Sequence, residues 1–382
     1  MRTLDELFRP YPRLSRARTQ DDQTDIFDLL DRTSMVSGSL ALTFGRRPDF
    51  FKFLRIQGAK LIVFLMRNED SSLQGIASMT IRPMKHDGRE VAITYASDLR
   101  TSPQLCRSAR LQWRKMYAEL MKELPTVPEF QGTRTMLTAV WDDNAVAQRS
   151  LVKKNKNMET LYSPLQDYSI LSVLGRFWRR RDRGDVRPAE PRDFPGIRER
   201  LCSPRNPRQL AWTPEDLDRT LSELGRSYAD FLVLDHADGS KSFVLPVDQI
   251  PGRTVIVHSL PSFWKYLRGF LRVVFRLDIR LGGELRIKSL LFAGANQWQD
   301  EGESLSRFLH FLMNRDLPLP AEKRPHLYSV ALWNQPDGIR HLRRRGFIGT
   351  TVGAKIYQVH HQDTPALKPE DMRMDNLEVF LL

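Results

Sequence analysis

Basic residues recur at regular intervals between positions 260 and 281 of this chain. They are Lys265, Arg268, Arg272, Arg276 and Arg280, and aromatic and aliphatic residues lie between them. A helix with this spacing presents a basic stripe opposite an apolar face, as helices at a membrane surface do. The pattern is also typical of a helix whose apolar face packs on its own domain while its arginines reach solvent. We expect packing within the protein, and we keep a partner interface and an anionic membrane surface at residues 263–280 as alternatives.

The histidines and cysteines form no recognisable catalytic or metal-binding motif. His360 and His361 are adjacent, and no HExxH or similar spacing is present. Cys106 and Cys202 are far apart in the sequence, so we expect two free thiols in a reducing compartment. A Walker loop, a GxGxxG motif after a strand and a GxSxG elbow are also missing. We therefore expect no metal site and none of the chemistries that these motifs support.

The composition describes a globular protein with a strong positive charge. The 382 residues are 41% apolar and 27% charged, with a formal net charge of +13, and they suffice for two domains with separate cores. An excess of cations favours anionic ligands, but no nucleic-acid-binding motif is present, so we do not expect nucleic acid as a partner. The N-terminal segment is charged throughout and no run of about 18 apolar residues occurs, so we expect a cytoplasmic protein.

Two stretches far apart in the sequence resemble each other. Arg16, Asp22, Ile26 and Leu30 recur as Arg187, Asp193, Ile197 and Leu201, at a constant offset of 171 residues. Strand-like runs that end at Trp141 and Trp333 follow, so the second copy would be about 21 residues longer. A repeat of this size predicts two similar domains.

The first copy, residues 14–175, has the pattern of an α/β unit. A short strand and an amphipathic helix come first, and apolar runs at 60–68, 76–84 and 91–99 then predict a three-stranded meander. Helical spacing from Leu105 to Leu124 predicts a helix of about 20 residues. A strand ending at Trp141 leads into a further helix behind an Asp or Asn cap.

A charged segment separates the first copy from the second. Residues 176–192 are rich in arginine and proline and predict a solvated linker. The second copy, residues 185–382, begins again with a strand and a helix and continues with a hairpin that turns at Asp238-Gly239. It holds the basic segment 260–281 as an insertion, and we expect closing strands that include 376–382.

The order of these elements resembles the GCN5-related N-acetyltransferase (GNAT) superfamily, in a subgroup built from two such domains in tandem. The residues that carry the resemblance are RARTQDDQTDIFDLL and VRPAEPRDFPGIRERL, YASDLRTSP before a helix, AVWDDNAVAQRSL, and HLRRRGF. The resemblance covers nearly the whole chain. It implies an α/β fold of two tandem domains, each with a mixed, mostly antiparallel central sheet flanked by helices.

The resemblance also implies a cofactor site. In such enzymes acetyl-CoA pairs with backbone groups of a splayed central strand, and its pyrophosphate meets the N–H groups at a helix N-terminus. Carried onto this chain, the resemblance assigns cofactor binding to Leu99, Arg100, Thr101, Arg107, Ser108, Ala109, Arg110 and Asn144. No side chain stands out as the catalytic base.

This chain departs from the family pattern at several positions. The family has small residues in the phosphate loop where Ala109 and Leu111 stand here, and it has a tyrosine where Leu151 stands. Tyr162 is an alternative proton donor for the leaving thiolate, although we expect a core tyrosine. In the second copy a helix start carries the acids Asp300, Glu301 and Glu303, which would repel a pyrophosphate. We therefore expect catalysis in the first copy only.

Two functions remain open from the sequence. The leading interpretation is an N-acyltransferase that moves an acetyl group from acetyl-CoA to an amine of a small molecule or a protein, which the residues do not identify. The alternative is a catalytically silent protein of the same fold that binds or regulates.

Overall fold

The computed structural model describes residues 2–18, 21–33, 35–37, 40–130, 132–152, 159–177, 185–204, 206–259, 279–293, 302–333, 338–374, 376–378 and 380. Most of the basic segment 260–281 lies outside this part of the chain, and so do Asp300 and Glu301. The predictions made for them stay predictions.

The first half forms the predicted meander, helix and strand. Its elements are α1 (Leu4–Phe8), β1 (Leu14–Arg16), α2 (Gln23–Arg32), β2 (Met35–Ser37), β3 (Leu40–Gly45), α3 (Phe50–Gln57), β4 (Lys60–Arg67), β5 (Leu73–His86), β6 (Arg89–Thr101), α4 (Arg107–Glu123), β7 (Thr133–Trp141), α5 (Ala145–Ala147) and β8 (Thr160–Arg176). Between α5 and β8, one π-helical turn spans Gln148–Val152.

The second half begins inside the predicted linker. Its elements are β9 (Val186–Pro188), α6 (Phe194–Cys202), β10 (Ala211–Trp212), α7 (Pro214–Glu223), β11 (Leu232–Asp235), β12 (Lys241–Val247), β13 (Thr254–Ser259), β14 (Ile287–Leu291), α9 (Glu303–Asp316), β15 (Leu327–Trp333), α10 (Gly338–Arg344) and β16 (Phe347–His361). The sequence also predicts a closing strand over 376–382. Its described residues, 376–378 and 380, form no β-strand.

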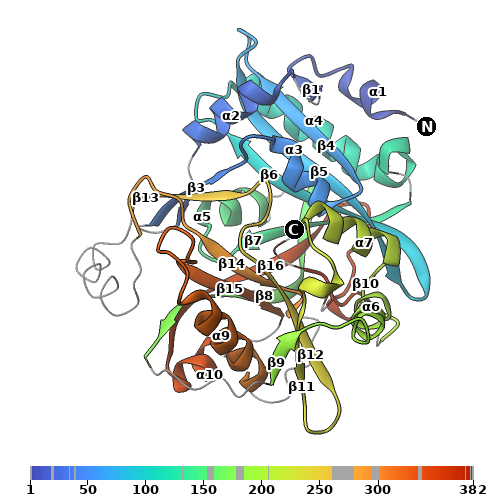
Figure 1. The fold of residues 1–382 in the computed structure, drawn as a ribbon. Helices are drawn as coiled ribbons and strands as arrows, with labels where there is room; N and C mark the ends of the chain where they lie inside the picture. Colours follow the sequence, from blue (N-terminus) through green and yellow to red (C-terminus); the bar gives the residue numbers. More distant parts are fainter. Residues whose placement is uncertain are drawn as a thin grey trace.

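One large mixed sheet runs through both halves, with helices on its faces (Figure 1). Its strand order is β1-β4-β5-β6-β7-β16-β8-β15-β14-β12-β11-β9, and β10 pairs with β5. The pairs β6–β7 and β14–β15 are parallel, and the other pairs between the described strands of this sheet are antiparallel. The last strand of each half crosses over: β16 lies against β7, and β8 lies against β15. The α/β fold with a mixed central sheet is thus confirmed, and the two halves share that sheet.

A second, three-stranded sheet joins the halves on one side of the molecule. Strand β13 pairs with β3 from Thr254 and Gly45 to Ser259 and Ala41, and β3 pairs with β2. The sequence did not indicate these pairings. In Figure 1 this small sheet stands beside α5 and the end of β7.

The repeated residues occupy matching places in the two halves. Asp22 and Asp193 are the N-cap residues of α2 and α6, and each carboxylate accepts a hydrogen bond from a preceding backbone N–H. One and two turns on, Ile26 and Leu30 in α2 match Ile197 and Leu201 in α6, all buried. The repeat in the sequence therefore corresponds to equivalent strand–helix units in the two halves.

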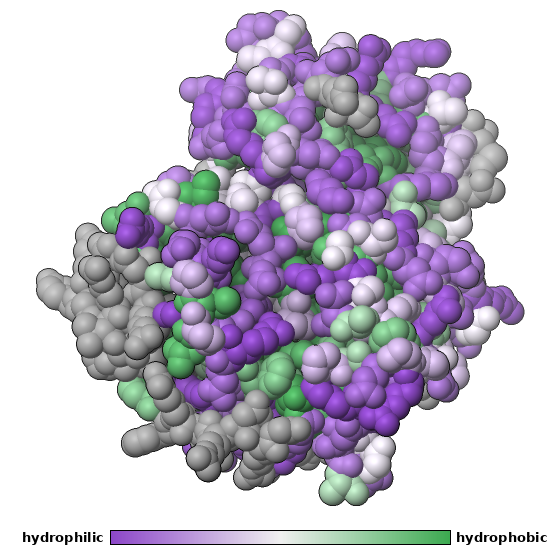
Figure 2. Space-filling view, in the orientation of Figure 1, coloured by the Kyte–Doolittle hydropathy of each residue, from purple (hydrophilic) through white to green (hydrophobic). Residues whose placement is uncertain are grey.

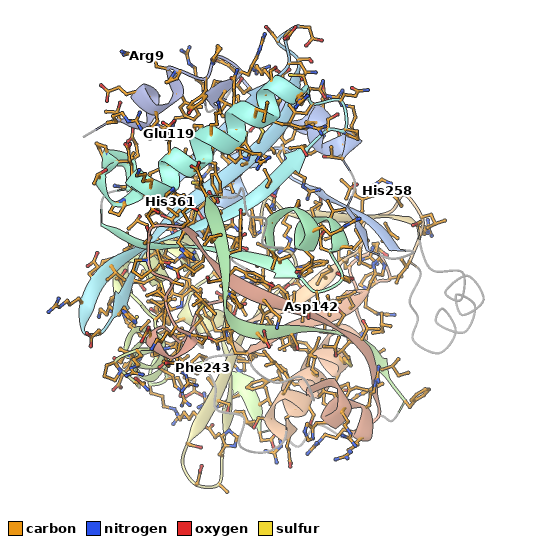
Figure 3. The ribbon with its side chains drawn as sticks, turned by 180° about the vertical axis from the view of Figure 1, so that it is seen from behind. Arg9, Glu119, Asp142, Phe243, His258 and His361 are labelled. Carbon is orange, nitrogen blue, oxygen red and sulfur yellow. The ribbon has the colours of Figure 1, made fainter. Side chains whose placement is uncertain are left out.

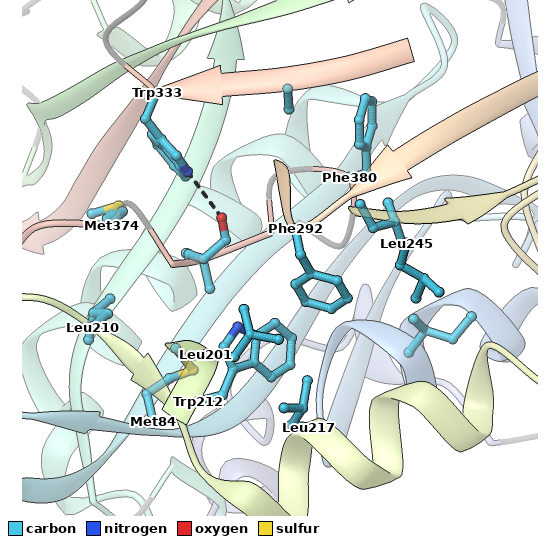
Figure 4. Close-up of a cluster of buried hydrophobic side chains, with 14 of the residues drawn as sticks. Met84, Leu201, Leu210, Trp212, Leu217, Leu245, Phe292, Trp333, Met374 and Phe380 are labelled. Carbon is cyan, nitrogen blue, oxygen red and sulfur yellow. Dashed lines mark hydrogen bonds between the residues drawn. The ribbon is translucent and has the colours of Figure 1, made fainter. Parts of the chain in front are cut away.

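The largest core lies where the two halves meet. Trp212 is fully buried, and its indole N–H donates a hydrogen bond of 2.8 Å to the Asn376 carbonyl oxygen. Trp333 donates in the same way to Leu377 across 3.2 Å, the contact drawn in Figure 4. These bonds fix the C-terminal segment between β10 and β15. The side of the molecule shown in Figure 2 is mostly hydrophilic, with apolar side chains in small groups.

Candidate active site

Strands β6 and β7 run parallel and then separate. Their pairing ends at Tyr95 and Leu137, although both strands continue beyond those residues. In the gap, the Thr138 hydroxyl donates a hydrogen bond of 2.9 Å to the Ala96 carbonyl oxygen. Backbone groups on the facing edges of the two strands are left for a ligand to pair with, because buried N–H and C=O groups require partners.

A β-bulge in β6 lies beside this gap. Ser97 pairs with Ser78 and Arg100 with Ile76, so β6 carries one extra residue. Within the bulge Asp98 has a φ of 49°, in the left-handed region that side chains other than glycine rarely adopt. Bulges of this kind turn backbone and side-chain groups out of the regular ladder and are frequent beside active sites.

A cavity of about 1000 Å³ spans the gap between the two strands. Helix α4, the segment 144–151 and strand β8 form further walls. Six basic and two acidic side chains line it: Arg46, Arg100, Arg114, Lys115, Arg149 and Arg253, with Asp98 and Glu159. This excess of cations favours an anionic ligand.

Four of the eight residues assigned to the cofactor line this cavity. Leu99, Arg100 and Thr101 come from the end of β6, and Asn144 follows β7. The Asn144 side chain caps α5, since its Oδ1 accepts a hydrogen bond of 3.0 Å from the Ala147 N–H. The role of these four residues in cofactor binding stays a prediction.

The other four belong to the start of α4 and do not line the cavity. Helix α4 begins at Arg107, so its first turn directs Arg107, Ser108 and Arg110 to solvent and buries Ala109 against the core. Leu111, which departs from the family pattern, does reach the cavity and is 44% exposed.

Sequence reasoning missed the cations that line the mouth of the cavity. Arg114 and Lys115 lie one turn further along α4, and Arg149 lies in the π-helical turn; all three are exposed. Helical spacing from Leu111 was an available signal, because Arg114 and Lys115 lie three and four positions after it and share its face of α4. Arg107 and Arg110 lie in the first turn of α4 and do not line the cavity.

We predict that Arg114 and Lys115 contribute more to binding of an anionic cofactor than Arg107 and Arg110 do. Replacing both lining cations by serine should weaken coenzyme A binding about three- to tenfold at low salt, since each exposed charge contributes little. The difference should shrink with added NaCl because salt screens exposed charges. Isothermal titration of R114S/K115S beside R107S/R110S and the same-helix control K122S measures this. Equal losses in the two double variants would contradict the prediction.

Deeper in the cavity, two arginines surround an aromatic ring. The Arg46 guanidinium lies 4.2 Å from the centre of the Phe53 ring, and the Arg253 guanidinium lies 5.6 Å from it and 5.1 Å from that of Phe44. Arg46 also forms an ion pair with Asp98 at 3.1 Å, in which both side chains are less than a tenth exposed. Burial chiefly, and then Arg46, lowers the pKa of Arg253 to about 10.

A second cavity of about 710 Å³ adjoins the first. It lies over β16, β8, β15 and β14 and is covered by β3 and β13. Most of its lining side chains are apolar, among them Leu42, Val255, Ile287 and Val352. The two cavities have seven lining residues in common: Phe44, Leu99, Arg100, Thr101, Trp141, Asn144 and Arg253.

Tyr162 lies in the wall of the first cavity and not wholly in the core. It is partly buried and packs beside Tyr117, another lining residue. Burial raises the pKa of Tyr162 to about 12, and a hydrogen bond with Tyr117 opposes part of that rise. The hydroxyl therefore keeps its proton at neutral pH. Leu151, at the family's tyrosine position, also lines this cavity.

Asp142, labelled in Figure 3, packs against β16 at the end of β7. Its N–H donates a hydrogen bond of 3.0 Å to the Gly353 carbonyl oxygen. A Cβ at position 353 would collide with the Asp142 carboxylate as it stands, so a larger residue there would displace that side chain. This contact fixes the turn that leads to Asn144.

The described residues contain neither a membrane-spanning helix nor a cluster of metal ligands. No helix within them is long and apolar enough to cross a membrane. No group of three or more His, Cys, Asp or Glu side chains among them could hold a metal ion.

Comparison with known proteins identifies similar folds. No family model matches the chain, and no curated protein matches its sequence. A crystal structure of Saccharomyces cerevisiae N-myristoyltransferase with bound myristoyl-CoA aligns at TM-score 0.54 and 13% identity, covering 98% of this chain and 85% of that one. A second structure of that enzyme with myristoyl-CoA aligns at TM-score 0.52 and 12% identity over 97% and 88% of the two chains.

A third similar structure contains a GCN5-related glucosamine N-acetyltransferase region in a fungal multi-domain β-N-acetylglucosaminidase. It aligns at TM-score 0.50 and 12% identity, covering 90% of this chain and 38% of that one. At these identities the likeness shows the fold alone. This chain therefore has the mixed α/β fold that these N-acyltransferases share.

Proposed function

We propose that this protein is a GNAT-type N-acyltransferase that binds an acyl-CoA in the cavity between β6 and β7. The observation that carries the proposal is the separation of the two parallel strands under a cavity lined by six basic and two acidic residues. Unpaired strand edges can pair with the amide groups of a pantetheine arm, and the exposed cations Arg114, Lys115 and Arg149 can bind its phosphates. We take acetyl-CoA as the donor, with an amine as the acceptor.

The reaction needs few groups from the protein. The acceptor's amine nitrogen attacks the thioester carbonyl carbon, a C–N bond forms, and the C–S bond breaks. The attacking nitrogen loses a proton and the leaving thiolate gains one. Holding the two reactants in the correct geometry accounts for a large share of the rate in such transfers. Backbone N–H groups at the bulge around Asp98 would stabilise the developing oxyanion.

Tyr162 is our candidate for the group that protonates the thiolate. We predict that Tyr162→Phe lowers kcat about 100-fold, a typical general-acid contribution, and leaves the affinity for acyl-CoA unchanged. Tyr117→Phe is the matched comparison, because it removes the neighbouring hydroxyl, which contacts the Met136 sulfur at 3.5 Å and hydrogen-bonds with Tyr162, and keeps the Tyr162 hydroxyl itself. Steady-state kinetics by thiol release measures both variants. Equal falls in kcat would assign the effect to the tyrosine pair and not to Tyr162.

Calorimetric titration with acetyl-CoA tests the proposal directly. We expect binding at micromolar concentrations, and absence of binding at millimolar concentrations would reject the proposal. Titration with butyryl-, octanoyl- and myristoyl-CoA then defines the acyl group, since each further CH₂ that is buried should add about 0.8 kcal/mol until the available space is filled.

The alternative is a protein of this fold that binds acyl-CoA without turnover. Leu151 and Leu111 motivate it, because both place aliphatic side chains in the cavity wall. The open cavity beside Asn144 favours the enzyme instead. A single-turnover experiment with radiolabelled acetyl-CoA and an amine mixture separates the two: label transferred to an amine supports the enzyme, and label that stays on coenzyme A with every amine supports the silent protein.

A further inference from the structure

Arg253 lies where the two cavities adjoin. It is one of the seven residues that line both of them. Within the part of the chain that the structure describes, Arg253 forms no ion pair, and its guanidinium donates a long hydrogen bond of 3.5 Å to the Phe380 carbonyl oxygen. The guanidinium also lies near the rings of Phe44 and Phe53. The charge is thus held in place without an acid in direct contact with it.

Arg46 has hydrogen-bonding capacity left over beside Arg253. The residue is 6% exposed, and its Nη2 is engaged by both oxygens of Asp98 at 3.1 Å. Its Nη1 is buried and has no partner among the described residues. A buried guanidinium N–H without an acceptor costs stability unless a ligand supplies one. The lining of the first cavity includes Arg46, so a ligand there has access to it.

The charges of this cluster do not balance. Arg46, Arg100 and Arg253 carry three positive charges and Asp98 carries one negative charge, and each arginine interacts electrostatically with Asp98. The Arg100 guanidinium also donates a hydrogen bond of 3.0 Å to the Thr33 carbonyl oxygen. An anionic ligand beside Arg46 and Arg253 would reduce the excess of positive charge. Planar guanidinium groups match the geometry of a carboxylate.

The cluster also lies apart from the cations that suit coenzyme A. Arg114 and Lys115 stand on α4 at the mouth of the first cavity. Arg46 follows β3, and Arg253 precedes β13, the two strands that cover the apolar second cavity. A molecule that occupies the second cavity would therefore contact Arg253 and Asn144, which both line the junction.

We propose that Arg253 and Arg46 form a carboxylate-binding subsite for the acceptor, so that the acceptor is an amine that carries a carboxylate and an apolar group. This inference rests on the proposed function, since it names the substrate class of that site. The carboxylate pairs with the Arg253 guanidinium and the free Arg46 Nη1, and the apolar group occupies the second cavity. The amine is then held beside the thioester at the junction.

Binding of 3-phenylpropanoate and of its uncharged analogue 3-phenylpropanamide tests the subsite without any acyl-CoA. By calorimetry, the wild-type protein should bind the carboxylate about tenfold more tightly than the amide, the effect of a hydrogen bond to a charged group. Arg253→Gln should abolish this preference, Arg253→Lys should retain part of it, and the exposed control Arg198→Gln should keep it. Thermal melting verifies that each variant is folded.

Several outcomes would overturn the inference. Equal affinity for the acid and the amide in the wild-type protein excludes a carboxylate subsite, as does failure to bind either. An unchanged preference in Arg253→Gln excludes Arg253. A parallel loss of acetyl-CoA affinity in Arg253→Gln assigns the arginine to the donor. If acetyl-CoA does not bind at all while the carboxylate preference stands, the proposed function fails and the anion site remains.

A turnover measurement then connects the subsite to the reaction. With acetyl-CoA as donor, phenylalanine should be acetylated with a kcat/KM about tenfold above that of phenylalaninamide. The double variant Arg46→Gln/Asp98→Asn removes both members of the ion pair and should lower this ratio. A ratio that is unchanged in the folded double variant would restrict the subsite to Arg253 and contradict the part assigned to Arg46.

Discussion

Ala96→Leu is expected to weaken acyl-CoA binding about 10- to 100-fold, because overpacking a filled site costs about 1–3 kcal/mol. Ala96 lies on β6 directly after the last residue paired with β7, and it lines the cavity. Its carbonyl oxygen accepts the hydrogen bond from Thr138 across the gap. A leucine side chain would occupy space that the ligand's chain needs. Calorimetric titration with acetyl-CoA measures the loss.

Ala92→Leu provides the matched control for this variant. Ala92 lies four residues earlier on the same strand, where β6 still pairs with β7 at Thr133, and it does not line the cavity. Both alanines are partly buried against the same core cluster, so the stability cost should be similar. Loss of binding in Ala92→Leu alone, or in neither variant, would contradict the location of the donor between the strands.

Lys288→Met is expected to lower the free energy of unfolding by about 3–5 kcal/mol, the cost of breaking a buried ion pair on one side. The Lys288 side chain is 2% exposed, and its ammonium lies 2.5 Å from an Asp316 carboxylate oxygen that is also buried. The Tyr328 hydroxyl donates to the same oxygen across 2.9 Å. With methionine at position 288 the Asp316 charge keeps that hydrogen bond and a longer ion pair with the half-exposed Arg315 at 3.6 Å. Urea denaturation measures the change.

Removing both charges should recover much of this loss. In Lys288→Met/Asp316→Leu no buried charge is left alone, and apolar replacements of buried pairs are often neutral or stabilising. The third partner, Asp248, is 66% exposed and can be hydrated after the substitution. A double variant as unstable as Lys288→Met would show that packing around Lys288, and not its charge, supports the strand. The pair joins β14 to the end of α9, so its loss should not change acyl-CoA affinity in the folded fraction.

The sequence by itself determined the meander, the long helix and the strand after it in the first half, and their order. Continuous apolar runs became β4 and β5, which are buried on both faces, and the spacing from Leu105 to Leu124 became α4, which buries one face. The repeat at an offset of 171 residues identified equivalent strand–helix units, since an aspartate that accepts from a preceding N–H and buried aliphatic residues recur in each. Strand β8 was missed, because exposed and buried residues do not alternate strictly along it.

Pairing between distant segments could be decided only by the tertiary structure. The crossing of β8 and β16 depends on which edges are free once both halves have folded, and neither strand records its partner in its own residues. The gap between β6 and β7 likewise arises where two strands separated by α4 cease to pair.

The charged side chains of the candidate site show the same division. The family resemblance could assign Arg100 and Asn144 to the site, because they lie at or after the ends of recognisable strands, and both line the cavity. Arg46 and Arg253 are 207 positions apart in the chain and meet only because β3 pairs with β13. Their burial, and with it the unpaired guanidinium edge, is a property of that contact. A sequence pattern registers local periodicity, whereas a charge imbalance inside a cavity depends on which distant groups the fold brings together.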